Sequence, residues 1–279
     1  MNIQLKISTM HIFVYTPTRN ALYDLGLMIF EAITLNQSIY CSISTTLNRD
    51  DVNVILGSHC IPYDQLSMIP DNSIIWNLEH LYDGSQWLDD KYKFILKKYK
   101  VWDFSENNIK YLREKLNVEA KIVKFGYTRL LKNIPFEVEE SIDVLFYGGI
   151  YGKRVEYITQ IRAAGINIVV GPNSFWGKVK ADLISKAKII LNLHLYNGGF
   201  EAPRVYHLLN NKKFVISEAS INDHEYISIA DGFVRVEMGN INAMISEIKY
   251  YLQHPTERRE IAETGYTSLK LIKTVIPNF

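Results

Sequence analysis

The fold of this chain is decided by the stretch Ile142-Asp-Val-Leu-Phe-Tyr-Gly-Gly149 and by the segment that follows it. A short apolar run that ends in glycine predicts a buried strand with a sharp turn after it. The next residues predict a helix from Lys153 to about Ala164, with Gly165 as its C-cap. The run 166–170 predicts a second strand. This strand–helix–strand order is typical of a parallel sheet.

The same alternation continues in both directions along the chain. Short apolar strands separated by amphipathic helices indicate parallel sheets covered on both faces. The alternation lapses from Thr128 to Ser141, where Pro135 and several glutamates indicate a linker. The sequence therefore predicts an α/β fold of two Rossmann-like, doubly wound domains, residues 1–130 and 141–260, with residues 261–279 as a helix or tail that packs back on the first domain. Strands are predicted at 11–15, 52–56, 73–76, 101–104, 120–123, 188–193, 214–217 and 232–236, and helices at 21–35, 105–116, 202–209 and from 240 onward.

The composition is that of a globular protein. Of 279 residues 47% are hydrophobic, and the formal net charge of +1 indicates no general attraction to nucleic acid. Two cysteines, Cys41 and Cys60, favour free thiols in a reducing compartment over a disulfide framework. No uncharged run approaches the roughly 20 residues of a membrane span, and the start resembles no signal peptide. A cytoplasmic protein without a transmembrane segment is expected.

Two loops at predicted strand ends carry groups that suit an anionic ligand. In the first, Gly148 and Gly149 allow close backbone approach, and Lys153 and Arg154 add positive charge at a helix N-terminus. A tight turn with two solvated cations explains the same residues, and both interpretations stay open.

The second loop follows another predicted strand, and Asn192 and His194 lie at the carboxyl end of that strand. Asn197-Gly-Gly199 then turns into a helix in which Glu201 and Arg204, three residues apart, share one face. A carboxylate there can accept two sugar hydroxyls, and a guanidinium can hold a diphosphate bidentately. The alternative is an intrahelical ion pair of little energetic value.

These motifs resemble a known family. Phe200-Glu-x-x-Arg204, followed by Phe214-Val-Ile-Ser-Glu218, is similar to the carboxyl-terminal domain of GT-B glycosyltransferases, most of all to the spore-coat-protein-like group of the group 1 type. The glycine loop up to Arg154 is similar to the same group's opening loop. Residues 73–80, 101–108 and 125–127 resemble its amino-terminal half, so that the resemblance covers about residues 74–218. One departure is Tyr206-His207, where many relatives have a second glutamate.

The resemblance implies two domains that face a cleft, with the acceptor on the side of residues 1–130 and a nucleoside diphosphate sugar in residues 141–260. It implies transfer of a hexose or pentose to a hydroxyl acceptor, such as a glycan or a lipid-linked molecule, with no metal ion and no cofactor beyond the donor, for which UDP is expected. Arg154 and Arg204 would neutralise the diphosphate, Glu201 would bind ribose or sugar, and Gly171 and Pro172 would lie near the base. The predicted donor site consists of Gly148, Gly149, Lys153, Arg154, Gly171, Asn192, His194, Gly199, Glu201 and Arg204.

On the acceptor side, Glu79 is the first candidate for the catalytic base and His80 the second. The alternative, which we slightly favour, is a structural hydrogen bond between them at the strand end. Tyr127, beside Gly126 at the domain junction, lines the cleft or serves as a hinge contact.

The segment Lys91–Lys100 mixes lysines with aromatic residues. A basic amphipathic helix suits an anionic membrane surface, and many GT-B enzymes use membrane-linked acceptors, so that peripheral membrane contact is a possible partner interaction. We favour instead a helix that packs Phe94, Ile95 and Leu96 into the core.

Two other functions remain open. A nucleotide-sugar epimerase has the same architecture and needs no acceptor. A non-catalytic coat or interaction protein would bind the sugar nucleotide without turnover. The sequence leaves the donor sugar, the acceptor (DNA or a surface glycan included), the anomeric outcome and the oligomeric state undefined.

Overall fold

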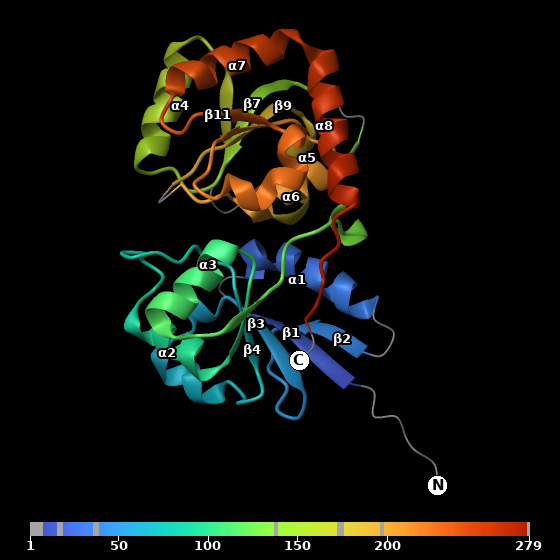
Figure 1. Ribbon diagram of the computed structural model, residues 1–279. Helices are drawn as coiled ribbons and strands as arrows, with labels where there is room; N and C mark the ends of the chain where they lie inside the picture. Colours follow the sequence, from blue (N-terminus) through green and yellow to red (C-terminus); the bar gives the residue numbers. More distant parts are fainter. Residues whose placement is uncertain are drawn as a thin grey trace. The chain divides into compact units, whose positions relative to one another are not determined.

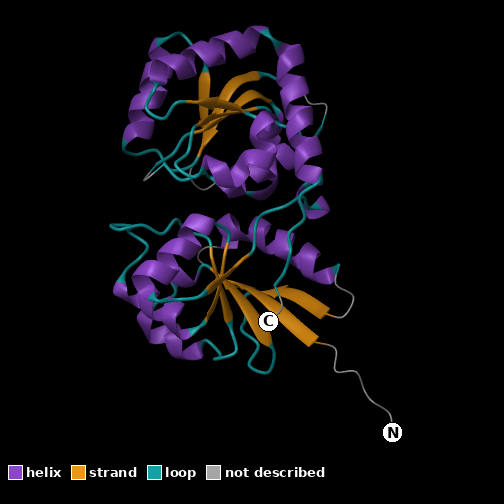
Figure 2. Cartoon of the chain, in the orientation of Figure 1, coloured by secondary structure: helices purple, strands orange, loops and turns teal. Residues whose placement is uncertain are grey.

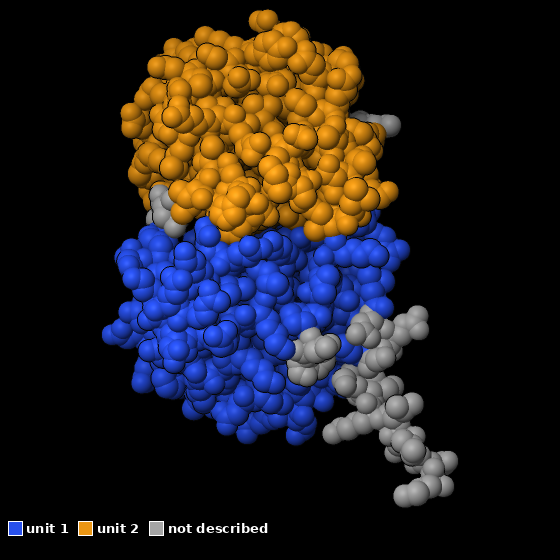
Figure 3. Space-filling model, viewed as in Figure 1, with its two compact units in different colours: residues 1–130, 273–279 blue, residues 131–272 orange. Residues whose placement is uncertain are grey.

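The computed structural model describes residues 8–15, 19–35, 39–136, 139–171, 176–195 and 198–277. The chain divides into two compact units, which are coloured separately in Figure 3. Unit 1 consists of residues 1–130 and 273–279, and unit 2 of residues 131–272. Each unit contains one parallel sheet with helices on both sides, so the predicted α/β class with two Rossmann-like sheets is confirmed (Figure 2).

Unit 1 is built on a sheet of 6 strands in the order β2-β1-β3-β4-β5-β6 (Figure 1). Helix α1 packs on one face, where Ile12 and Val14 contact its Gly26. Helix α2 packs on the other face, with Phe13 and Ile55. The elements are β1 (Ser8–Val14), α1 (Arg19–Thr34), β2 (Ile39–Ser44), β3 (Val52–Leu56), η2 (Ser58–Cys60), η3 (Tyr63–Met68), β4 (Ile74–Asn77), α2 (Asp90–Lys98), β5 (Lys100–Asp103), α3 (Glu106–Tyr111), the π-helical turn η4 (Leu112–Leu116), β6 (Ala120–Ile122) and, at the unit boundary, η5 (Arg129–Leu131).

One connection in unit 1 departs from the usual strand–helix–strand order. Between β2 and β3 the chain forms no helix and crosses back in a short loop, residues 45–51. Leu47 of this loop and Leu66 of the 3₁₀ helix η3 therefore join α2 in covering the face of the sheet that carries Phe13.

Unit 2 is built on a sheet of 5 strands in the order β11-β10-β9-β7-β8. Its core joins the side chains of β7 and β9 to α4 and α7, with Val144, Phe146, Tyr157, Ile189 and Met244 all buried. The elements are β7 (Ile142–Tyr147), α4 (Lys153–Ala163), β8 (Ile168–Gly171), α5 (Gly177–Ser185), β9 (Ala187–Asn192), α6 (Ala202–Asn210), β10 (Val215–Glu218), η6 (Asp223–Gly232), β11 (Val234–Val236), α7 (Ile241–Gln253) and α8 (Pro255–Lys270).

Helix α8 packs closely against η6 where two glycines meet, Gly265 of α8 and Gly232 of η6. A Cβ atom on Gly232 would lie 2.3 Å from the Cα atom of Gly265, so the two backbones touch. Helix α8 also contacts α6. The last helix of the chain is therefore part of unit 2 up to residue 272.

Two local predictions can be compared directly with the structure. Ser105, at the start of the helix predicted for residues 105–116, caps α3, because its side chain accepts a hydrogen bond from the Asn108 N–H. The prediction for Phe94 is wrong. Tyr92, Ile95 and Leu96 face the core from α2, whereas Phe94 is 50% exposed, because its position lies on the opposite side of the helix from these three.

No helix within the described ranges has the length and apolar character needed to cross a membrane.

Candidate donor and acceptor sites

The carboxyl edge of the sheet in unit 2 brings the predicted donor residues together. Tyr147 pairs with Gly171, and Asn192 pairs with Ser217, so these strand ends lie at one level. The first strand of the unit, β7, has β8 on one side and β9 on the other. Strand order reverses at this point, and open parallel sheets bind their ligands outside the carboxyl ends of such strands.

Gly148 lies between two guanidinium groups. Its φ of 125° favours glycine, and a Cβ atom there would lie 2.9 Å from Nη2 of Arg204 and 3.7 Å from Nη1 of Arg154. Glycine at this position therefore leaves room for both cations beside the backbone of the loop. This geometry brings together Gly148, Arg154 and Arg204, which belong to two separate sequence motifs.

Arg154 holds the loops of the site. Its Nε and Nη2 donate to the Leu193 carbonyl at 3.0 and 2.6 Å, and its Nη1 donates to the Gly149 carbonyl at 3.0 Å. Burial, together with the charge of Arg204, lowers the pKa of Arg154 to about 10, so it stays charged at neutral pH. Because most of its donors are bound to carbonyl oxygens, Arg154 acts on a ligand mainly through its charge and through the loops that it fixes.

Arg204 is the more open of the two cations. It lies over the rings of Phe146 and Tyr147, and its Nη1 donates to the Asn192 side chain at 3.1 Å. Its Nε is buried and has no hydrogen-bond partner in the described part of the chain. A buried donor without a partner is costly, so the site is suited to an acceptor such as a phosphate oxygen.

Glu218 is a buried carboxylate that sequence reasoning placed in a motif but not in the site. It accepts hydrogen bonds from the Tyr157 hydroxyl at 2.8 Å and the His194 N–H at 2.7 Å, and it lies 3.2 Å from Nζ of Lys153. Burial alone would raise its pKa, but these hydrogen bonds and the charge of Lys153 outweigh burial and lower it. Glu218 therefore ties the start of α4 to the ends of β9 and β10.

His194 is fully buried in the same network. Its Nε2 lies 3.0 Å from the Glu218 carbonyl oxygen and 2.8 Å from Oγ of Ser220. Burial lowers the pKa of His194, which favours the neutral ring. Since a carbonyl oxygen can only accept, Nε2 carries the proton, and Nδ1 is left as an acceptor with no partner among the described residues.

The remaining predicted donor residues line the same edge. Oε1 of Glu201, which is about one-third exposed, lies 3.4 Å from Nη2 of Arg154. Gly199 precedes it in the loop that leads to α6. Pro172 and Asn197 lie outside the described residues.

In unit 1 a polar network occupies the carboxyl ends of β4 and β5. Asp103, fully buried, accepts hydrogen bonds from the amide of Asn77 at 2.7 Å, the Ser105 N–H at 2.9 Å and the amide of Asn108 at 3.0 Å. Both asparagine amides also donate to the Glu79 carbonyl, at 2.9 and 2.8 Å. The network therefore fixes the backbone of Glu79.

The side chain of Glu79 faces His59, a residue that the sequence reasoning missed. Nε2 of His59 lies 3.5 Å from Oε1 of Glu79, and the imidazole packs edge-on against Trp87 and Tyr92. Burial lowers the pKa of His59 to about 4, with the charge of Lys91 acting in the same direction, so the ring is neutral at pH 7. No spacing in the sequence links the 3₁₀ turn of His59 to the strand end of Glu79.

The other two acceptor-side candidates lie elsewhere. His80 packs its ring against Phe104 and is half-buried. Tyr127 is half-buried after β6, near the end of unit 1. Within the described ranges, no three histidine, cysteine or acidic side chains gather as a metal site requires.

The comparison with protein families gives one match. Residues 148–271 match the model of a family described as glycosyl transferase-like. The match begins at the glycine loop and includes the predicted donor residues of β9 and α6. No curated protein shows significant similarity to the chain.

Solved structures resemble the chain in fold. WaaG, a glycosyltransferase involved in lipopolysaccharide biosynthesis, has a TM-score of 0.62 at 11% identity, covering 95% of this chain and 96% of WaaG. Anabaena HepE in complex with UDP and glucose has a TM-score of 0.61 at 8% identity, covering 95% of each chain. TarM has a TM-score of 0.59 at 11% identity over 81% of this chain, which spans only 53% of TarM.

The chain has the two-sheet fold of the GT-B glycosyltransferases. Within it, unit 2 contains a glycosyl transferase-like domain over residues 148–271.

Proposed function

We propose that the protein transfers a hexose or pentose from a nucleoside diphosphate sugar to a hydroxyl acceptor, without a metal ion. The observation that carries this proposal is the Arg204 guanidinium beside Gly148, with a buried Nε that has no partner among the described residues. Arg154, Lys153 and the N-terminus of α4 add positive potential at the same edge of the sheet.

In this mechanism the bond between the anomeric carbon and a phosphate oxygen breaks, and the diphosphate gains negative charge as it leaves. Arg204 donates to the phosphate oxygens, and Lys153 and Arg154 stabilise the developing charge from fixed positions. Glu201 and Nδ1 of His194 accept hydrogen bonds from hydroxyls of the sugar or ribose. Gly148, Gly149, Asn192 and Gly199 shape the loops, and Gly171 leaves space for the base.

On the acceptor side, Glu79 takes the proton of the acceptor hydroxyl as it attacks the anomeric carbon. The hydrogen bonds from Asn77 and Asn108 hold its backbone, and the neutral ring of His59 lies beside its carboxylate. His80 and Tyr127 stay secondary candidates for contacts to the acceptor.

UDP is the first nucleotide to test, because HepE was solved with UDP and glucose. We also propose that the protein acts in the cytoplasm, since neither Cys41 nor Cys60 forms a disulfide.

The decisive experiment is a thermal-shift and titration panel with UDP, GDP, ADP and CDP. One nucleotide should raise the melting temperature, because a ligand that binds only the native state stabilises it. Arg204→Lys should weaken binding of that nucleotide by about 10- to 100-fold, since lysine cannot replace bidentate hydrogen bonds to phosphate. Arg162→Lys, on α4 outside the site, is the matched control. Nucleotide affinities unchanged in Arg204→Lys would contradict the proposal.

Product analysis separates the alternative functions. A transferase releases nucleoside diphosphate in the presence of acceptor, whereas an epimerase isomerises the donor without releasing it. A binding protein without turnover would leave the donor unchanged.

A further inference from the structure

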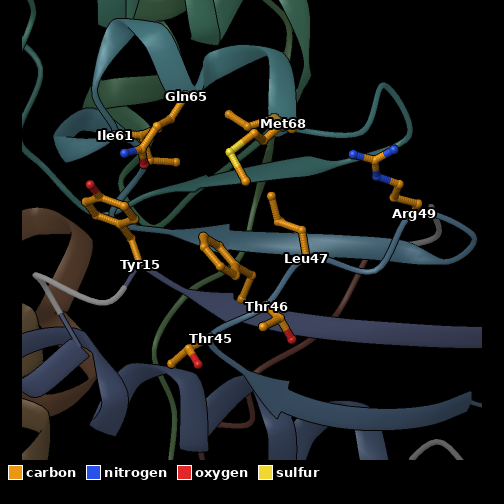
Figure 4. Close-up of a pocket in the computed structure, with 10 residues that line it drawn as sticks. Tyr15, Thr45, Thr46, Leu47, Arg49, Ile61, Gln65 and Met68 are labelled. Carbon is orange, nitrogen blue, oxygen red and sulfur yellow. The ribbon is translucent and has the colours of Figure 1, made fainter.

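A cavity of ≈ 350 Å³ opens on the sheet of unit 1 (Figure 4). It lies where the loop 45–51 replaces a covering helix. Phe13 and Tyr15 come from the end of β1, Leu47 from the loop, and Ile61 and Met68 from the segment after β3. These side chains give the cavity a mainly apolar lining.

The position of this cavity matches that of the donor site in unit 2. In unit 1 the strand order reverses at β1, which has β2 on one side and β3 on the other. The cavity is bounded by residues that follow β1, β2 and β3, at the carboxyl ends of these strands. By the same rule that places ligands at such a reversal, this is the ligand-binding position of the unit 1 sheet.

One end of the cavity carries a positive charge. Tyr15 and Arg49 lie at opposite ends, with the Arg49 side chain extending from the loop 45–51 (Figure 4). Arg49 has no hydrogen bond or ion pair with the described residues. At the mouth, Met68 is 57% exposed, although an apolar side chain gains by burial against a ligand. An apolar cavity with one guanidinium at its end is complementary to an anionic amphiphile.

The cavity is also linked to the acceptor side of the proposed reaction. Ile61 lies two residues after His59, whose ring contacts Glu79. A ligand with its apolar part beside Ile61 therefore lies near the segment that carries the neighbour of the proposed base.

We infer that this cavity binds the acceptor, and that the acceptor is an anionic amphiphile: a hydroxyl-bearing head group joined through a phosphate to an apolar chain. This inference rests on the proposed transferase function. The apolar chain packs against Phe13, Leu47, Ile61 and Met68, and Arg49 binds the phosphate.

The test is calorimetric titration of the full chain, without nucleotide, with hexyl, heptyl and octyl phosphoglycerol. Binding should strengthen about fourfold per methylene while the chain still fits the cavity. Arg49→Gln should weaken binding of octyl phosphoglycerol at least tenfold and leave octyl glucoside unchanged, whereas the control Arg113→Gln, at an exposed position of η4, should change neither. Leu47→Trp should abolish binding of both, and Leu35→Trp, 67% exposed at the end of α1, should abolish neither. Inorganic phosphate at equal concentration should not compete.

The nucleotide panel and a transfer assay distinguish the two proposals. If a nucleotide binds but Leu47→Trp leaves the affinity for octyl phosphoglycerol unchanged, this inference is overturned and the proposed function stands. If octyl phosphoglycerol binds in a way that depends on Arg49 and Leu47 but no nucleotide of the panel binds, both the proposed function and the acceptor role are overturned. Support requires that octyl phosphoglycerol accept sugar in the wild type and in Leu35→Trp, but not in Leu47→Trp.

Discussion

Gly148 determines where the Arg204 guanidinium can lie, because the space that a side chain would occupy is taken by that cation. The nearest atom to an added Cβ is the end of a flexible side chain, at 2.9 Å, and not a backbone atom. A methyl group at Gly148 would therefore displace the guanidinium more than it would disturb the fold.

For Gly148→Ala we expect nucleotide binding about tenfold weaker or worse, from loss of a charged hydrogen bond. The cost in stability should be about 1–2 kcal/mol, from the positive φ. Gly165→Ala is the control: its φ is 80° and nothing lies within 4 Å of an added Cβ, so stability should fall similarly with binding intact. Titration and urea unfolding measure the two effects, and unchanged binding in Gly148→Ala would contradict this account of the loop.

Asp103 gives a second prediction at the residue scale. Burial raises its pKa from 3.8 to about 7, although the hydrogen bonds from Asn77, Ser105 and Asn108 oppose the rise. The native state therefore binds more protons at this group than the unfolded state between those two values. Its contribution to stability is fully present below pH 3.8 and is lost as the pH rises through about 7.

Asp103→Asn removes this titration. The substitution lowers the free energy of unfolding by an amount that does not depend on pH. The reason is that the asparagine N–H groups would face hydrogen-bond donors, where the wild-type carboxylate oxygens accept. Relative to the wild type, however, the variant should gain stability as the pH rises from 5 to 8. Urea unfolding at several pH values measures the difference, and a difference that does not change with pH would exclude titration of Asp103 in this range.

Contacts between elements depend on features that sequence patterns do not record. Helix α8 packs against η6 and α6, and its Gly265 leaves 2.9 Å between an added Cβ and the Cα atom of Gly232. Alanine normally stabilises a helix interior relative to glycine by about 1 kcal/mol. Here the backbone of η6 stands in the way and cannot rotate aside as a side chain can.

Gly265→Ala should therefore destabilise the protein by about 1–3 kcal/mol, the usual cost of overpacking, in spite of its better helix propensity. Thr267→Ala, an exposed position on the same helix, should be neutral or slightly stabilising. Thermal or chemical unfolding of both variants decides the sign, and a stabilised Gly265→Ala would show that α8 can move away from η6.

Most elements were predictable from the sequence because buried parallel strands leave apolar runs and helix ends leave glycines or caps. That Gly148, Asn192 and Arg204 lie close together was predictable for the same reason, since they lie at the carboxyl ends of strands of one sheet or after them. Burial of Phe94 was predicted wrongly because an alternating lysine pattern does not fix the rotation of a nine-residue helix. The pair His59 and Glu79 could not be predicted, because two unrelated loops bring them together in space.

Over the whole molecule, the two sheets have the same reversal of strand order, at β1 in unit 1 and at β7 in unit 2. The proposed donor and acceptor sites each lie at one of these reversals. The nucleotide and the proposed acceptor should therefore bind to different parts of the chain.

Hydrogen exchange detected by mass spectrometry tests this division. The nucleotide that raises the melting temperature should slow exchange in peptides spanning residues 148–154 and 192–204. Octyl phosphoglycerol should instead slow exchange in residues 45–51 and 61–69. The Arg204→Lys variant should lose only the first effect at a fixed nucleotide concentration. Slowed exchange in the same peptides with both ligands would contradict separate sites.

Unit 2 is inserted in the chain between the two parts of unit 1, residues 1–130 and 273–279. A protease that cuts near residue 130 would therefore not separate the units. The fragment that contains unit 2 would still end in a segment belonging to unit 1, and non-covalent contacts of that segment would hold the nicked protein together. A second cut near residue 272 would remove this link, so release of unit 2 should require both cuts.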